Sequence, residues 1–156
     1  MKKYWYKTAM LVMALGVFTA CSDDDGPKIP EGPIALVNGA YVINTGNWNE
    51  NNGTIQWYDR DLKTVSADLF AAANGAGIGD AQDLCVYGTK IYITCSSSAK
   101  IEIVDRKDFK RIKTLNLTNE SGQPIQPRYM TAAKGNIYFT AYDGTVSVSY
   151  THLTLP

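Results

Sequence analysis

Residues 81–94 read AQDLCVYGTKIYIT, and they align without gaps with residues 127–140, which read PRYMTAAKGNIYFT. A second pair of segments repeats at the same spacing, because TIQWYD at 54–59 matches KIEIVD at 100–105, 46 residues later. The triplet at 144–146 begins a third copy. A period of this length filled with short strands is the size of one four-stranded propeller blade.

Each repeat is expected to consist of short antiparallel strands, because polar and apolar residues alternate along it. In the second unit the expected strands are 84–87, 90–94, 100–104 and 111–117. In the first unit they are 41–44, 54–58 and 64–68, and residues 69–74, rich in alanine, are expected to form a helical turn. Hairpin turns are predicted at 88–89, 105–108, 134–136 and 143–144.

Composition also favours an all-β domain, since the chain contains ten tyrosines and 13 glycines. From Cys21 onward, 12 Lys and Arg residues stand against 15 Asp and Glu residues, so that part has a net charge of −3. It contains no basic stripe of the kind that binds nucleic acid. Cys85 and Cys95 flank one predicted hairpin that would pair Cys85 with a residue near Tyr92, which favours two thiols over a disulfide.

The first twenty residues have the features of a secretory signal peptide. Lys2, Lys3 and Lys7 precede an apolar stretch at 8–18 that is too short to span a bilayer. Phe18-Thr19-Ala20-Cys21 resembles a lipobox, although Phe18 stands where leucine is usual. We therefore expect Cys21 to be the lipidated N-terminus of the mature protein, the alternative being an ordinary signal followed by a chance cysteine.

Residues 21–33 are expected to form an acidic, proline-rich tether. Ser22-Asp23-Asp24-Asp25 resembles the signal that exports some lipoproteins to the outer face of the outer membrane, and is otherwise a solvated linker. At the other end, residues 148–156 (VSYTHLTLP) read like a translated sequencing adapter rather than a natural strand. His152, the only histidine, falls in that tail, so the expected partial propeller comprises residues 34–147.

From about Asn38 to Ser147 the chain resembles the YncE-like, YVTN-type β-propellers. The resemblance rests on Pro-Arg-Tyr followed by Gly-Asn-Ile-Tyr-Phe-Thr in the third unit, and on Lys-Ile-Tyr-Ile-Thr and Ile-Glu-Ile-Val-Asp in the second. It implies an all-β propeller, usually of seven blades, of which this chain holds about two and a half four-stranded blades. Propeller repeats specify a fold far better than a function.

Catalytic motifs are absent from this part of the sequence. Gly75-Ala76-Gly77-Ile78-Gly79 has the wrong glycine spacing for a dinucleotide fingerprint and is better explained as a loop between blades. No Ser–His–Asp set or histidine-based metal site can form once His152 is set aside. Asp80 and Asp83 could bind a cation, but carboxylates before a strand more often cap turns. The sequence predicts no cofactor and no metal.

A ligand-binding face is easier to predict. In propellers the loops that enter each inner strand and those that join the second and third strands gather around the channel. The residues that this rule places together are Asn47, Trp48, Gln82, Asp83, Arg128, Tyr129, Tyr142 and Asp143. The loop at 45–52 carries Trp48 among amide and acidic side chains, which suits a flat or amphipathic ligand. Packing of Trp48 on a neighbouring blade is the alternative.

Three functions follow as expectations. The first is a surface-exposed, lipid-anchored propeller that captures a small molecule or glycan for an outer-membrane transporter; the resemblance makes cobalamin the most specific ligand. The second is a lactonase-like hydrolase, which the resemblance also allows. The third is a protein-interaction or envelope scaffold.

Overall fold

The computed structural model describes residues 38–149, which form three antiparallel sheets and one short helix. Their bounds are β1 (Gly39–Asn44), β2 (Thr54–Asp59), β3 (Thr64–Val65), α2 (Leu69–Asn74), β4 (Ala81–Tyr87), β5 (Lys90–Cys95), β6 (Lys100–Asp105), β7 (Arg111–Asn116), β8 (Pro127–Ala133), β9 (Asn136–Ala141) and β10 (Val146–Ser149). The signal segment, Cys21, the tether and His152 lie outside the described residues. Within these residues, no helix is long and apolar enough to cross a membrane.

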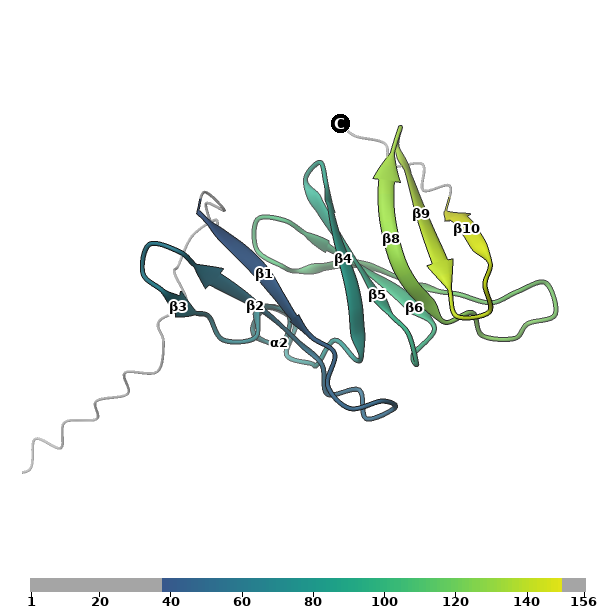
Figure 1. Ribbon diagram of the computed structural model, residues 1–156, viewed down its shortest axis with the longest axis horizontal. Helices are drawn as coiled ribbons and strands as arrows, with labels where there is room; N and C mark the ends of the chain where they lie inside the picture. Colours follow the sequence, from purple (N-terminus) through teal and green to yellow (C-terminus); the bar gives the residue numbers. More distant parts are fainter. Residues whose placement is uncertain (1–37, 150–156) are drawn as a thin grey trace, which may run out of the picture.

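The three sheets stand side by side in chain order, and within each sheet every strand pairs with the next one along the chain (Figure 1). β8 and β9 begin 46 residues after β4 and β5, and β10 begins 46 residues after β6. By this repeat the first sheet corresponds to β5–β6–β7 and the third sheet to β4–β5–β6. The described strands therefore amount to two and a half four-stranded blades, which confirms the predicted partial β-propeller.

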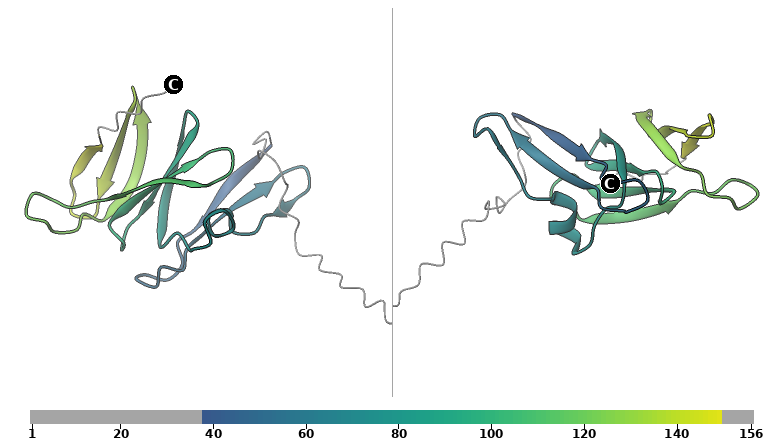
Figure 2. Two further views of the ribbon diagram at one scale, coloured as in Figure 1. Left: turned by 180° about the vertical axis from the view of Figure 1, so that it is seen from behind. Right: turned by 60° about the horizontal axis from the view of Figure 1, so that its bottom comes forward.

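The strand predicted at 64–68 was wrong beyond Val65, where β3 ends. Asp68 does not continue the strand because its carboxylate caps α2, accepting from the backbone N–H of Phe70 at 3.1 Å. The helical turn predicted at 69–74 is confirmed as α2. It ends at Gly75, whose φ of 65° is the left-handed conformation that glycine adopts without strain. Seen from behind, α2 lies in front of the first sheet (Figure 2).

The hydrophobic core lies between the sheets. The first two blades share a cluster of apolar residues that includes Ile55, Phe70, Ile91 and Val104. A second cluster joins β5 and β6 to β9, and its buried members are Tyr92, Ile101, Ile103, Ile137 and Phe139. Each blade thus buries one face against the next blade, which is how propeller repeats gain their stability.

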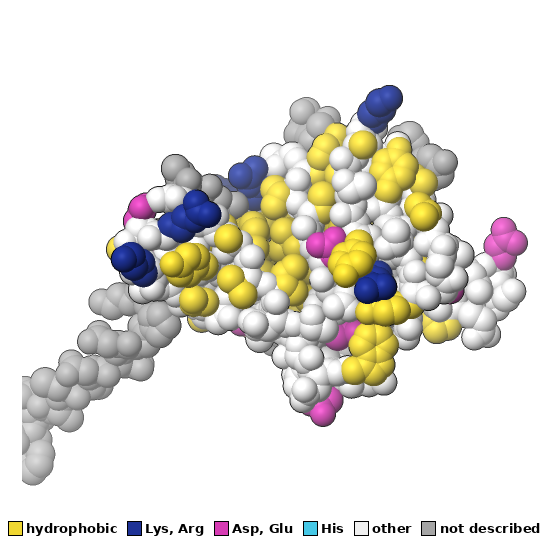
Figure 3. All heavy atoms as spheres, in the orientation of Figure 1, with side chains coloured by type: hydrophobic (Ala, Val, Ile, Leu, Met, Phe, Trp, Pro, Cys, Tyr) yellow, Lys and Arg dark blue, Asp and Glu magenta, His cyan; other side chains and the backbone are white. Residues whose placement is uncertain are grey.

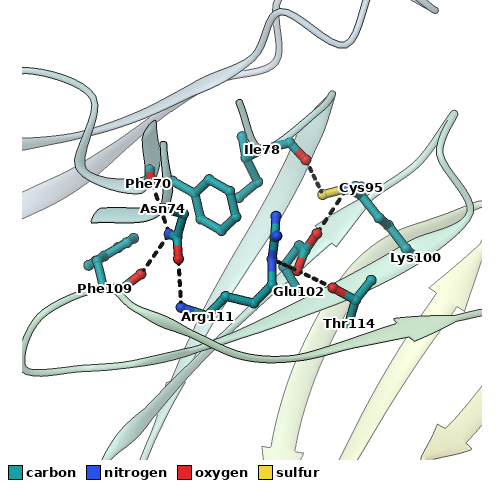
Figure 4. Close-up of polar contacts among 9 residues, drawn as sticks. All are labelled: Phe70, Asn74, Ile78, Cys95, Lys100, Glu102, Phe109, Arg111 and Thr114. Atoms are coloured by element: carbon teal, nitrogen blue, oxygen red, sulfur yellow. Dashed lines mark hydrogen bonds and ion pairs between the residues drawn. The ribbon is translucent and has the colours of Figure 1, made fainter. Parts of the chain in front are cut away.

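A polar network also links α2 to the second blade (Figure 4). Glu102 is buried in β6 and accepts from Lys100 Nζ at 2.9 Å, Arg111 Nε at 3.0 Å and Thr114 Oγ1 at 2.7 Å. Asn74 in α2 donates to the carbonyl of Phe109 at 3.0 Å and accepts from the backbone N–H of Arg111. A buried carboxylate is tolerated when its oxygens are paired and hydrogen-bonded in this way.

Both cysteines are free thiols, as the sequence predicted. Cys85 lies opposite Tyr92 in the β4–β5 hairpin, and Cys95 lies opposite Ala81. Burial raises the pKa of the Cys95 thiol to about 12, and it also raises the pKa of Cys85. Both side chains are therefore protonated at neutral pH and act as small apolar groups in the hairpin.

Candidate ligand-binding face

The predicted site residues come from four segments that meet at one edge of the sheets. These segments are the β1–β2 loop, the start of β4, the start of β8 and the β9–β10 loop, all at the lower edge in Figure 1. They meet there because β4 and β8 both begin at this edge, whereas β1 and β9 end at it. The structure places the ends of three blades around one surface.

Two β-bulges lie at this edge and occupy equivalent positions in the repeat. Gln82 is the extra residue between Ala81 and Asp83, which pair with consecutive residues of β5. In β8, Arg128 and Tyr129 lie between residues that pair with Ala141 and Phe139 of β9, so both face Thr140. A bulge redirects side chains out of the regular alternation of a strand. These bulges turn Gln82, Arg128 and Tyr129 toward the edge.

Trp48 and Tyr142 meet although they belong to the first and third blades. Their ring centroids are 5.7 Å apart with an interplanar angle of 75°, an edge-to-face arrangement. Both remain accessible, with 49% of Trp48 and 47% of Tyr142 exposed. Trp48 therefore packs on another blade and still presents surface to solvent, so the two interpretations of this residue are not exclusive.

Hydrogen bonds from the second blade hold Tyr142 in position. The Tyr142 hydroxyl donates to Gln82 Oε1 at 3.0 Å, and Gln82 Nε2 donates to Thr45 Oγ1 at 3.3 Å. These two hydrogen bonds thus connect Thr45 in the first blade, Gln82 in the second and Tyr142 in the third. Thr45 was not predicted as a site residue, because nothing in the repeat indicated which side chain Gln82 would contact.

Arg128 lies against two tyrosine rings. Its Cζ is 4.9 Å from the ring centroid of Tyr129 and 5.2 Å from that of Tyr142, both within cation–π range. Figure 3 shows hydrophobic side chains in yellow above and below dark blue cationic atoms near the middle of the visible face. The backbone beneath is anchored to the second blade, because Thr94 Oγ1 donates to the Arg128 carbonyl at 2.9 Å and the Ser96 hydroxyl donates to the Pro127 carbonyl.

Asn47 serves the structure of its own loop. Its Nδ2 donates to Glu50 Oε2 at 2.8 Å, and its backbone N–H donates to Asn52 Oδ1 at 2.8 Å. Asn49 and Asn51 have φ of 66° and 52°, the left-handed region that asparagine tolerates better than most residues. The amide groups of Asn47 and Asn52 therefore hold the shape of this loop.

The two aspartates near β4 also hold backbone together. Asp83 Oδ2 accepts from the Met130 N–H at 2.8 Å, which joins the second blade to the third. Asp80 is buried and accepts from the Ser97 N–H at 2.5 Å. The Asp80 contact agrees with a turn or capping role, whereas Asp83 links two blades. Residues 38–149 contain no group of three or more His, Cys, Asp or Glu side chains arranged to hold a metal ion.

Asp143 closes the β9–β10 turn. Its Oδ1 accepts from the Thr145 hydroxyl at 2.7 Å and from the Thr145 N–H at 2.9 Å. These hydrogen bonds lower the pKa of Asp143, so the carboxylate is ionised at neutral pH. Of the predicted residues, Trp48, Gln82, Arg128, Tyr129 and Tyr142 form a contiguous cluster. Asn47 and Asp143 make contacts within their own loop and turn, and Asp83 joins the second blade to the third. We call the five residues of that cluster the aromatic–arginine cluster.

No protein-family model matches the chain. No curated protein matches it either. Among solved structures, a chain of the nidogen/laminin complex is similar with a TM-score of 0.51 and 18% identity, over 71% of this chain and 38% of that one. The β-propeller domain of Cps50 (Swd1) from Myceliophteria thermophila has a TM-score of 0.47 and 11% identity, over 72% and 34%. This chain therefore spans well under half the length of either protein.

At such identities the similarity shows the fold alone. Together with the three repeated antiparallel sheets, it establishes that the described residues are part of a β-propeller. The propeller provides a scaffold that brings loops from successive blades to one face.

Proposed function

We propose that this chain belongs to a lipid-anchored, surface-exposed propeller that binds a small molecule or glycan for uptake across the outer membrane. The observation that carries the proposal is the aromatic–arginine cluster, in which two exposed tyrosine rings lie against one arginine and an exposed tryptophan packs on one of those tyrosines at the loop face. Large exposed aromatic groups held in fixed positions are typical of binding surfaces. The lipid anchor and the surface location rest on the sequence of residues 1–33.

The contacts within the cluster support binding rather than simple exposure. Trp48, Tyr129 and Tyr142 are each about half exposed, yet Tyr142 is held by a hydrogen bond and Trp48 by an aromatic contact. Side chains that are already ordered lose little conformational entropy when a ligand binds. Nothing comparable in the described residues favours the hydrolase alternative.

Truncation of the cluster tests the binding face. In the full-length protein we expect Trp48→Ala and Arg128→Ala each to weaken ligand binding by about 1–3 kcal/mol, because both side chains would contact the ligand directly. Cobalamin is the first ligand to titrate, followed by neutral glycans, and isothermal calorimetry gives the affinity. Cys85→Ser, in the second blade and away from the cluster, is the control. Unchanged affinity in both the Trp48 and Arg128 variants would refute this placement.

Changes near the N-terminus test the proposed address. We expect Cys21→Ala to abolish lipid attachment, since no thiol remains to be acylated, and to leave an unprocessed or unanchored protein. Replacing Asp23, Asp24 and Asp25 by alanine should preserve the lipid but remove most of the protein from the cell surface. Protease accessibility in whole cells measures display, and full accessibility after the triple change would rule out the export signal.

A further inference from the structure

Two arginines in the described residues lie over aromatic rings, and only one of them has an acidic partner. Arg111 Cζ is 5.1 Å from the ring centroid of Phe70, and its Nε donates to Glu102 at 3.0 Å. Arg128 lies over two rings, but no ion pair or side-chain hydrogen bond joins it to any other residue within 38–149. The N–H edge of its guanidinium therefore retains its hydrogen-bonding capacity.

No salt bridge joins Arg128 to an acid among the described residues, and the acids of this face accept hydrogen bonds from other groups. Asp83 accepts from the Met130 N–H, Asp143 accepts from Thr145, and Glu50 accepts from the Asn47 and Asn52 side chains. Asp143 is thus bound within its turn, Glu50 within its loop, and Asp83 in the contact between the second and third blades. The charge on Arg128 therefore faces solvent next to exposed aromatic rings.

The Arg128 guanidinium lies against two rings, and the groups around it are held in place. Tyr142 is held by Gln82 and by the edge contact with Trp48, and the backbone of Arg128 is held by Thr94. An arginine whose planar fork is already oriented loses less entropy for each hydrogen bond that it forms, and the fork matches the two oxygens of a carboxylate or phosphate. Arg128 could therefore bind an oxyanion of a ligand, as Arg111 binds the carboxylate of Glu102.

We infer that the ligand of this face carries an oxyanion on a ring with an apolar face, with the oxyanion on the N–H edge of Arg128 and the ring against Trp48 and Tyr142. This inference rests on the proposed binding function and adds the chemical class of the ligand. The oxyanion completes the hydrogen bonding of the guanidinium, and the ring covers the exposed aromatic surface. A carboxylate on an aromatic ring and a carboxylate on a sugar ring share this chemistry.

Paired acidic and neutral probes test the inference on the full-length protein. One arm compares 2-naphthoate with 2-naphthamide, and the other compares a galacturonate oligosaccharide with the matched galactose oligosaccharide. We expect one of the acids to bind about 10- to 100-fold more tightly than its neutral counterpart, the range for hydrogen bonds to charged groups. The arm that shows the preference identifies the kind of ring.

Variants of Arg128 test whether the guanidinium causes the preference for the acid over its neutral counterpart. Arg128→Gln should reduce it to within about 2-fold, and Arg128→Lys should restore only part of it, because an ammonium keeps the charge without the planar fork. Arg106→Gln, at an exposed arginine in the β6–β7 turn, should leave the preference unchanged. Unchanged thermal unfolding of the variants excludes a folding effect.

Equal affinity for the acid and its neutral counterpart in both arms would overturn the inference, as would a preference that survives Arg128→Gln. If neither acid binds while cobalamin binds and that binding requires Trp48, the inference fails and the proposed function stands. If none of the probes binds and cobalamin does not either, both fail.

Discussion

Replacing Tyr92 by alanine is expected to lower the free energy of unfolding by about 3–5 kcal/mol, the usual cost of removing a buried aromatic side chain. Tyr92 is 0% exposed and lies in the cluster that joins the second blade to the third. Its removal would leave a cavity beside Ile103 and Phe139. Since domains are stable by only about 5–15 kcal/mol, this one change removes a large share of the total.

Tyr92→Phe is the matched control, because it keeps the ring and removes only the hydroxyl. The Tyr92 hydroxyl is buried without a hydrogen-bond partner among residues 38–149, and burial raises the pKa of the phenol, so the group is neutral. An unpaired buried hydroxyl destabilises the folded state, so we expect Tyr92→Phe to be neutral or stabilising by up to about 1 kcal/mol. Urea unfolding of the full-length protein measures both variants. A loss of similar size in Tyr92→Phe would show that the hydroxyl, not the ring, matters.

The second large effect concerns the exposed face of the third blade. Tyr138 occupies the position in β9 that Tyr92 occupies in β5, but no further sheet covers it within the described residues. This face contains an apolar hollow of about 270 Å³ lined by Tyr129, Met130, Thr131, Tyr138, Phe139, Thr140 and Val146. Val146 is 70% exposed and lies on β10, the edge strand of the sheet. An apolar face beside an open edge strand favours association.

We therefore expect the 156-residue chain, produced without residues 1–20, to self-associate at concentrations of about 10 µM and above. The double change Tyr138→Lys and Val146→Lys should restore most of the monomer, because charges on an edge sheet oppose pairing with another chain. Ile112→Lys is the control, since Ile112 is 50% exposed on β7 in another blade. Size-exclusion chromatography with light scattering distinguishes these results. A monomer with a single cooperative unfolding transition in the unchanged chain would contradict the prediction.

The sequence alone was sufficient to predict the positions of most strands in this protein. The repeat of 46 residues and the alternation along each segment located β4 to β9 and the start of β10, because side-chain alternation and hairpin turns are local features of the sequence. Val148 and Ser149, which were assigned to the adapter-like tail, pair with Tyr138 and Ile137 as the second half of β10. The strand prediction failed at Asp68, where the strand predicted from Thr64 ends at Val65. Asp68 caps a helix because Leu69 and Phe70, the first residues of α2, are buried in the core. The periodicity of the sequence does not show which residues the core will bury.

For the candidate site, too, the sequence predicted one part and only the tertiary structure decided the other. The repeat and the usual arrangement of propeller loops were enough to choose Trp48, Gln82, Arg128 and Tyr142, since equivalent loops of successive blades lie at one edge. Their contacts were decided only by the tertiary structure. Trp48 meets Tyr142 across 94 positions of the sequence, and the bulges that turn Gln82 and Arg128 appear only in the strand register. Contacts between blades depend on how twisted sheets pack on one another, and that packing is a property of the whole core rather than of any single segment.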